Sequence, residues 1–223
     1  VGDAQRAALD AERERYGVPA RYFVYSGRHD ARHDLGTLLD ALSGNGETLV
    51  LASENRRTKA ASPMEMASGD GAAALLTGTK SVIAKLIGKA SGSADFVDHF
   101  RSMDNTFDYQ WEERWVRDAG YMKIVPPVIA RCLASANVKT EDVGTFILPS
   151  TIRGVSAAVA KAAKITDTAV ADALGAVCGD TGVAHPLVML VAALEKAKPG
   201  DKILVVGFGQ GADMSAFAPN AHL

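Results

Sequence analysis

This chain of 223 residues contains little cysteine, has almost no excess of charge of one sign, and lacks long apolar runs. The two cysteines, Cys132 and Cys178, show no paired spacing, which excludes a cysteine-rich zinc site and fits a reducing compartment. The formal net charge is -2, so composition points to neither nucleic acid nor an anionic membrane as a main partner. No apolar run approaches the roughly 18 residues that a membrane span needs, and no segment has the pattern of a signal peptide. We therefore expect a cytoplasmic protein without a metal site.

The most informative stretch is the glycine-containing turn over 178–186 and the apolar run that follows it. Asp180 and Thr181 are good N-cap residues, and Pro186 suits the first turn of a helix predicted over 187–196. Backbone N–H groups at a helix N-terminus favour negative charge, so this turn could hold a thioester oxygen, an oxyanion or a phosphate. A capped core helix explains the same residues equally well.

The predicted elements form an internal repeat. The first copy is a helix, a strand, a glycine corner and a second strand, at 30–42, 47–53, 69–71 and 72–77. The second copy has the same order at 186–196, 202–206, 207–211 and 212–218. Alternation of helices with buried strands predicts an α/β protein with largely parallel sheets, here two sheets related by a pseudo-twofold axis.

Other segments are predicted from local patterns. A loop is expected over 54–68, and the strand 81–87 is expected to form a hairpin with 72–77. Residues 91–120 are the least regular part, whereas Pro126-Pro127 indicates the start of a helix that runs to Ala136. The remaining predicted elements are helices over 3–16 and 154–164 and strands over 22–25 and 145–148.

Three segments resemble the thiolase superfamily, and most closely the branch of hydroxymethylglutaryl-CoA synthase and ketoacyl-carrier-protein synthase III. They are Gly69-Asp70-Gly71 with the following small residues, the turn Gly179-Asp180-Thr181-Gly182, and the strand pair over 198–213. The resemblance implies a layered αβαβα fold with two pseudo-symmetric halves, of which the N-terminal half is expected to be incomplete in this chain. It divides the chain into the remainder of the N-terminal half at 1–90, an irregular insert at 91–125 and the C-terminal half at 126–223.

The resemblance also implies a function. Members act as acyltransferases that form or break a C–C bond next to a thioester, with a coenzyme A thioester as substrate and no tightly bound cofactor. The expected partners are acyl-CoA and a second copy of the chain in a homodimer. One alternative is a cysteine-independent aldol or retro-aldol lyase, with a zinc-ribbon/OB-fold protein or domain as partner. Another is a non-catalytic scaffold subunit of a thiolase-like complex.

The family's Cys/His/Asn set is absent as such. Its cysteine position falls near Ser26, or near His33 in a second register, and its asparagine position falls on Asp180. Its histidine position falls on the segment Leu148-Pro149-Ser150-Thr151, which has no histidine. The catalytic candidates are therefore Ser26 as nucleophile, Asp180 as base or orienting group, and His185. His185 begins a predicted helix, whose dipole favours a neutral ring that could donate to a thioester carbonyl; core packing is the alternative.

Further candidates concern ligand binding. Arg56, in a short basic loop with Arg57 and Lys59, could bind coenzyme A phosphates. Arg153 resembles the arginine of the family's Asn-x-Arg segment, which lines the coenzyme A tunnel, and Gly209 belongs to the glycine corner. Additional candidates are His99 as acid or base, Cys178 as a thiol near the turn, and Trp111 with Trp115, whose spacing is more typical of packing.

Overall fold

The computed structural model describes residues 22–25 and 48–220, and the side chains from residue 48 onward. The first sheet contains β1 (Tyr22–Tyr25), β2 (Thr48–Glu54) and β3 (Gly71–Thr77) in that order. β1 is parallel to β2, and β2 is antiparallel to β3. Ser26, His33 and the helices predicted over 3–16 and 30–42 lie outside the described residues.

The second sheet has the strand order β4-β9-β8-β7, formed by β4 (Ala84–Ser93), β9 (Gly211–Pro219), β8 (Ile203–Gly209) and β7 (Thr145–Ile147). β7 is parallel to β8, and β8 is antiparallel to β9. The series β7-β8-β9 thus repeats the pairing of β1-β2-β3, as the internal repeat in the sequence predicts. The expectation of largely parallel sheets is wrong, because Gly211 (φ +128°) lets the chain turn straight back after β8 into an antiparallel hairpin.

The partner expected for residues 81–87 is also wrong. These residues form no hairpin with β3; β4 instead lies antiparallel to β9 at the edge of the second sheet. Glycines explain this position, because a side chain at Gly88 would collide with Ala136, and one at Gly92 would collide with Val128. β4 can therefore pack closely against the helix that carries both residues. It also crosses the boundary predicted at residue 90, and the division into three domains stays a prediction.

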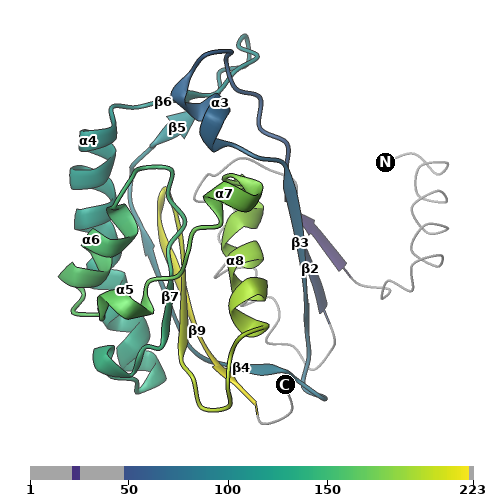
Figure 1. The fold of residues 1–223 in the computed structure, drawn as a ribbon, viewed down its shortest axis with the longest axis vertical. Helices are drawn as coiled ribbons and strands as arrows, with labels where there is room; N and C mark the ends of the chain where they lie inside the picture. Colours follow the sequence, from purple (N-terminus) through teal and green to yellow (C-terminus); the bar gives the residue numbers. More distant parts are fainter. Residues whose placement is uncertain (1–21, 26–47, 221–223) are drawn as a thin grey trace, which may run out of the picture.

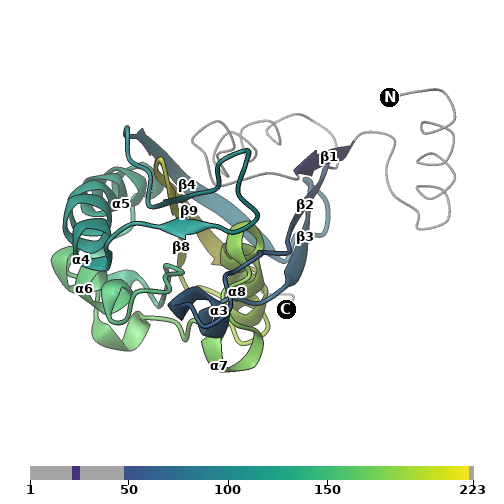
Figure 2. The same ribbon diagram turned by 90° about the horizontal axis from the view of Figure 1, so that it is seen from above.

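Helix α8 (His185–Leu194) lies between the two sheets (Figures 1 and 2). Its apolar residues join a buried cluster with Val50 of β2, Ile147 of β7 and Val205 of β8. The opposite face of the second sheet is covered by α4 (Glu113–Trp115), α5 (Met122–Ala136) and α6 (Val155–Ala162). The described residues thus form four layers, which are the helices α4 to α6, the second sheet, α8 and the first sheet. The fifth layer stays a prediction, because the helix predicted over 30–42 lies outside the described residues.

Helix α5 begins earlier than Pro126-Pro127 predicts. The Glu112 carboxylate accepts hydrogen bonds from the N–H groups of Arg114 (3.1 Å) and Trp115 (2.9 Å), so helical structure starts there. A π-helical segment, Val116–Tyr121, connects α4 to α5. The π-helical segment ends about one helical turn before Pro126 and Pro127, which remove two backbone donors from α5.

Short elements gather at one end of the layers (Figure 1). They are α3 (Pro63–Ala67), within the segment predicted to be a loop, the strand pair β5 (His99–Phe100) and β6 (Tyr109–Gln110), and α7 (Gly175–Cys178). Single 3-10 turns occur at Thr140–Asp142, Asp167–Ala169 and Gly182–Ala184. None of the described helices combines the length and apolar character needed to cross a membrane.

Candidate functional site

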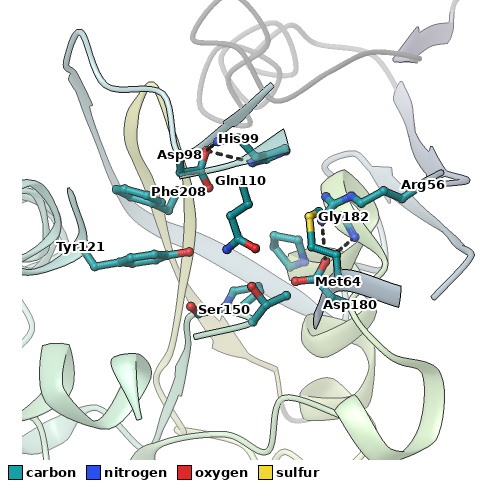
Figure 3. A pocket seen from close by; sticks show the side chains of 13 residues that line it. Arg56, Met64, Asp98, His99, Gln110, Tyr121, Ser150, Asp180, Gly182 and Phe208 are labelled. Carbon is teal, nitrogen blue, oxygen red and sulfur yellow. Dashed lines mark hydrogen bonds and ion pairs between the residues drawn. The ribbon is translucent and has the colours of Figure 1, made fainter. Parts of the chain in front are cut away.

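A cavity of about 50 Å³ lies at this end of the layers (Figure 3). It is lined from six parts of the chain by Arg56, Met64, Asp98, His99, Gln110, Tyr121, Pro149, Ser150, Thr151, Asp180, Gly182, Pro186 and Phe208. Since one water needs about 10–15 Å³ by the same measure, the cavity has room for a few waters or for a small acyl group. Most polar lining side chains are carboxylate, hydroxyl, amide or imidazole groups, which suit acid–base chemistry and hydrogen bonding.

The two glycine motifs of the sequence meet beside this cavity. The Asp180 N–H donates to the Ala67 carbonyl at 2.7 Å, and the Gly69 N–H donates to the Asp180 carbonyl at 2.9 Å. A side chain at Gly69 would collide with the Cys178 carbonyl, so only glycine allows this close approach. The turn that carries Asp180 is thereby fixed to the segment that leads into β3.

Asp180 lines the cavity, but its capping role differs from the one predicted. Its carboxylate accepts a hydrogen bond from the Gly182 N–H at 2.7 Å and so caps the short 3-10 turn that precedes α8. The N-cap position of α8 itself is Ala184. Ser150, in the segment 148–151 on which the family's histidine position is expected to fall, lines the same cavity after β7. The structure therefore brings together two positions that are far apart in the sequence.

His185 is buried, with 2% of its surface exposed, and it is not among the lining residues. Its Nδ1 accepts a hydrogen bond from the Thr181 N–H at 3.1 Å, which assigns the ring proton to Nε2. Nε2 lies 2.8 Å from the Ala173 carbonyl and donates to it. Both ring nitrogens are thus used inside the protein. The expectation that His185 donates to a ligand is not supported, because its donor already has a buried partner.

Arg56 also departs from its expected role. Its side chain is 6% exposed, and its guanidinium lies near three carboxylates: Glu54 at 3.6 Å, Asp108 at 3.8 Å and Asp180 at 4.0 Å. Glu54 in turn accepts a hydrogen bond from the Val183 N–H at 2.9 Å. Arg56 thus lies between carboxylates of β2 and of the turn before α8, and its buried Nε makes no hydrogen bond in the described part of the chain. A coenzyme A phosphate at Arg56 would have to compete with these carboxylates, and the phosphate role of Arg56 stays a prediction.

His99 and Asp98 approach the cavity from the β5–β6 pair (Figure 3). The His99 Nδ1 lies 2.9 Å from Asp98 Oδ1, which also accepts the His99 N–H at 3.0 Å. Burial lowers the pKa of His99, but the hydrogen bond and charge of Asp98, with a smaller contribution from Asp108, outweigh burial and the nearby Arg56. The pKa of His99 is therefore raised above its ordinary value of 6.5.

Tyr121 closes the opposite side of the cavity at the end of the π-helical segment (Figure 3). Its ring stacks on Phe208 of β8, with ring centroids 3.9 Å apart, and its hydroxyl hydrogen-bonds with Ser150. Burial and the charge of Asp98 raise the pKa of Tyr121 far above its ordinary value. The Tyr121 hydroxyl is therefore a hydrogen-bond donor and not a base at neutral pH.

The other sequence candidates lie outside the cavity lining. Arg153 is exposed on the loop before α6, and Gly209 ends β8 opposite Gly211. Cys178 is half-buried at the end of α7. Trp115 stacks on Phe96 with ring centroids 4.5 Å apart, which supports the packing interpretation. Among the residues that the structure describes, no group of three or more histidine, cysteine, aspartate or glutamate side chains is arranged to hold a metal ion.

Several lining residues were not singled out from the sequence. Gln110 belongs to the least regular segment, 91–120, and Tyr121 directly follows it, whereas Ser150 was considered only as part of the segment 148–151. The available signal was the density of aromatic and histidine residues between 99 and 121, which is unusual for a solvated connection.

Comparisons with known proteins agree with this architecture. Residues 133–219 match the family described as 3-oxoacyl-[acyl-carrier-protein] synthase III C terminal. A curated hydroxymethylglutaryl-CoA synthase from Methanopyrus kandleri is 25% identical over 175 residues, which cover 76% of this chain and 49% of that protein. The chain thus spans about half the length of this curated relative.

Solved structures show the same fold. The 3-oxoacyl-(acyl carrier protein) synthase III of Pseudomonas aeruginosa PAO1 matches with a TM-score of 0.69 and 17% identity, over 85% of this chain and 62% of that one. A hydroxymethylglutaryl-CoA synthase complexed with CoA matches with a TM-score of 0.67 and 16% identity, over 92% of this chain and 58% of that one.

Proposed function

We propose that this chain, which belongs to the thiolase superfamily and carries the C-terminal domain found in 3-oxoacyl-(acyl carrier protein) synthase III and hydroxymethylglutaryl-CoA synthase, acts on an acyl thioester. The carrier is coenzyme A, and the reaction forms or breaks a C–C bond next to the thioester carbonyl. The substrate enters with its acyl end in the cavity beside Ser150 and Asp180.

The observation that carries the proposal is the meeting of Ser150 and Asp180 in one cavity. By the family resemblance, the histidine position is expected within the segment 148–151, which contains Ser150, and the asparagine position is expected at Asp180. The described lining residues include no thiol, and the nearby Cys178 is not among them. Transfer through a thioester intermediate needs a nucleophile, whereas aldol chemistry needs only a base and donors for the developing oxyanion. Because Ser26 or His33 stands at the family's cysteine position, the sequence favours the cysteine-independent lyase over the acyl-enzyme form.

Calorimetric titration of the chain with coenzyme A and acetyl-CoA tests the proposal. We expect saturable binding of acetyl-CoA, and we expect 3-hydroxybutyryl-CoA to be cleaved to acetyl-CoA and acetaldehyde. No binding of either thioester at millimolar concentration would contradict the proposed function.

A second measurement separates the two forms of the reaction. After incubation with labelled acetyl-CoA and an acid quench, the protein is expected to carry no label, since the cysteine-independent reaction has no acyl-enzyme. Covalent label that disappears in Ser26→Ala would show that Ser26 is a nucleophile and would exclude the lyase form. Ser26→Ala with unchanged cleavage of 3-hydroxybutyryl-CoA would support it.

A non-catalytic scaffold role in a thiolase-like complex is a second candidate, because the outer edge of β3 pairs with no described strand. β4 covers the outer edge of β9, whereas the equivalent edge of β3 pairs with no strand in the described part of the chain. Leu76 on β3 is 61% exposed, and open edges of this kind favour pairing with another chain. Native mass measurement tests this role: a monomer of 23.4 kDa that turns over thioesters would exclude it.

The free cysteines are consistent with a cytoplasmic location.

A further inference from the structure

We propose that His99, oriented by Asp98, is the acid–base residue of this cavity. It supplies, from the β5–β6 pair, the imidazole that the sequence lacks at the position of Ser150. This inference rests on the proposed function, because it assigns the proton transfer of that reaction.

The geometry of the pair fixes the ring of His99. Asp98 Oδ1 accepts the Nδ1–H of His99 at 2.9 Å, so proton exchange with a substrate takes place at Nε2. The same oxygen holds the backbone N–H of His99, and the Asp98 carbonyl accepts the Trp111 N–H at 3.0 Å. The pairing of His99 with Gln110 places a second polar side chain beside the ring.

Aromatic side chains pack on the outer side of this strand pair. Phe100 and Tyr109 pack against each other with ring centroids 5.4 Å apart, and Tyr109 meets Trp111 edge-on at 5.8 Å. Trp111 packs against Trp115 of α4 at 5.9 Å. This cluster holds the outer face of the β5–β6 pair, so His99 and Gln110 on the pair face a cavity whose other walls come from both sheets.

The charged groups around His99 favour a ring that changes protonation near neutral pH. Asp98 and Asp108 stabilise the imidazolium, whereas burial and Arg56 oppose it, and the pKa of the ring is raised above 6.5. Asp180 and Tyr121 line other parts of the cavity. A base with a pKa close to the working pH combines a useful deprotonated fraction with proton affinity.

The proton transfers balance for cleavage of a 3-hydroxyacyl thioester. Nε2 of His99 takes the proton of the 3-hydroxyl group, the hydroxyl carbon becomes a carbonyl, and the bond between C2 and C3 breaks. The electron pair of that bond passes to C2 and the thioester oxygen as an enolate. The imidazolium then returns its proton to C2, which gives a shortened thioester and an aldehyde or ketone. Condensation is the reverse of these steps.

Donors for the enolate oxygen are present in the same cavity. The Tyr121 hydroxyl is held in its protonated form and shares a hydrogen bond with Ser150, so one of these two hydroxyls can donate to the enolate, and the Gln110 amide is a further donor. Such donors contribute about 10²–10³-fold each when they face the developing charge. The arrangement thus contains a base and oxyanion donors without a thiol.

Hydrogen–deuterium exchange of the acetyl-CoA methyl group tests this assignment, because exchange requires only removal and return of a proton at C2. In D2O we expect the wild-type chain to exchange the methyl protons, as followed by proton NMR. His99→Gln should slow exchange about 10²–10⁴-fold, the usual contribution of a general base. It should leave the calorimetric affinity for acetyl-CoA within about twofold. Lys139→Gln, an exposed residue outside the cavity, is the matched control and should exchange like the wild type.

The pH profile distinguishes proton transfer from a structural role. Exchange by the wild-type chain should rise with pH through the pKa of His99 and then level off. Asp98→Asn removes the negative charge that helps to raise this pKa, whereas its amide oxygen can still accept the Nδ1–H, so its profile should shift to lower pH while its plateau falls. This readout applies even if His99→Gln fails to fold.

Each outcome decides between the two proposals. Failure of acetyl-CoA to bind the wild-type chain would overturn both. Binding without exchange, exchange unchanged in a folded His99→Gln, or an unshifted profile in Asp98→Asn would overturn the assignment of His99 alone. Exchange lost in Ser150→Ala but kept in His99→Gln would place the base elsewhere in the cavity.

Discussion

The Nε2 atom of the buried His185 lies 2.8 Å from the carbonyl oxygen of Ala173, and Nδ1 accepts the Thr181 N–H. We therefore expect His185→Ala to lower the free energy of unfolding by about 2–4 kcal/mol, because it leaves a cavity and two buried groups without partners. Urea denaturation measures this loss. His185→Asn can still accept the Thr181 N–H and should lose less. A folded His185→Ala of unchanged stability but without thioester activity would restore the catalytic hypothesis for this residue.

Gly182 is the second position where we expect a large effect. Its φ of +59° is unfavourable for other residues, and a side chain there would collide with the Glu54 carboxylate. Gly182→Ala should therefore cost about 1–3 kcal/mol and break the contact between Glu54 and Val183. Gly175→Ala is the matched control, because that exposed position has no atoms near the new methyl group. Thermal unfolding of both variants tests the difference, and equal melting temperatures would contradict it.

Arg56 is expected to matter more for stability than for phosphate binding. Arg56→Met leaves three carboxylates without their shared cation, and loss of one partner from a buried ion pair typically costs about 3–5 kcal/mol. Arg57→Met changes the exposed neighbour and should be close to neutral. The measurement is urea denaturation of both variants, with acetyl-CoA affinity determined on the folded protein. A stable Arg56→Met with a weakened affinity would support the phosphate role instead.

The stability of the chain should depend on pH through His99. Its pKa is raised in the folded protein, so the folded state binds a proton more tightly than the unfolded chain, whose pKa is about 6.5. The resulting stabilisation is complete below pH 6.5 and is lost as the pH rises through the folded pKa. Urea denaturation between about pH 6 and pH 8 should therefore show a steeper loss for the wild type than for His99→Gln. Parallel curves would contradict the raised pKa.

The two cysteines should differ in reactivity. Cys132 is fully buried, and burial raises its pKa to about 11, so the reactive thiolate is scarce. Cys178 is half-buried at the end of α7. Treatment of the native protein with iodoacetamide at pH 8 should add one label, on Cys178, and denaturant should be required for the second. Peptide mass mapping identifies the labelled site, and early modification of Cys132 would show local opening of α5.

Local patterns predicted the apolar strands β2, β3, β7, β8 and β9 and the helix α8, but not the short polar and aromatic strands β5 and β6. They could not predict the partner of β4. Gly88 and Gly92 let β4 pack closely against Ala136 and Val128 of α5, and this contact joins segments that are far apart in the sequence. The burial of Arg56 was hidden for the same reason, since its three carboxylates come from separate segments. The sequence made His99 a candidate acid or base, and only the fold shows that it shares a cavity with Ser150 and Asp180.

The position of α8 has a consequence for synthesis of the chain on the ribosome. β2 and β3 emerge well before α8, yet their inner residues, such as Val50, are buried only when α8 packs against them. The apolar inner face of the first sheet therefore stays exposed until the rest of the chain, up to α8, has been translated. Contacts between segments so distant in sequence slow folding and leave the nascent chain exposed to aggregation. A nascent chain that stops short of α8 should thus depend on chaperones that bind exposed apolar strands.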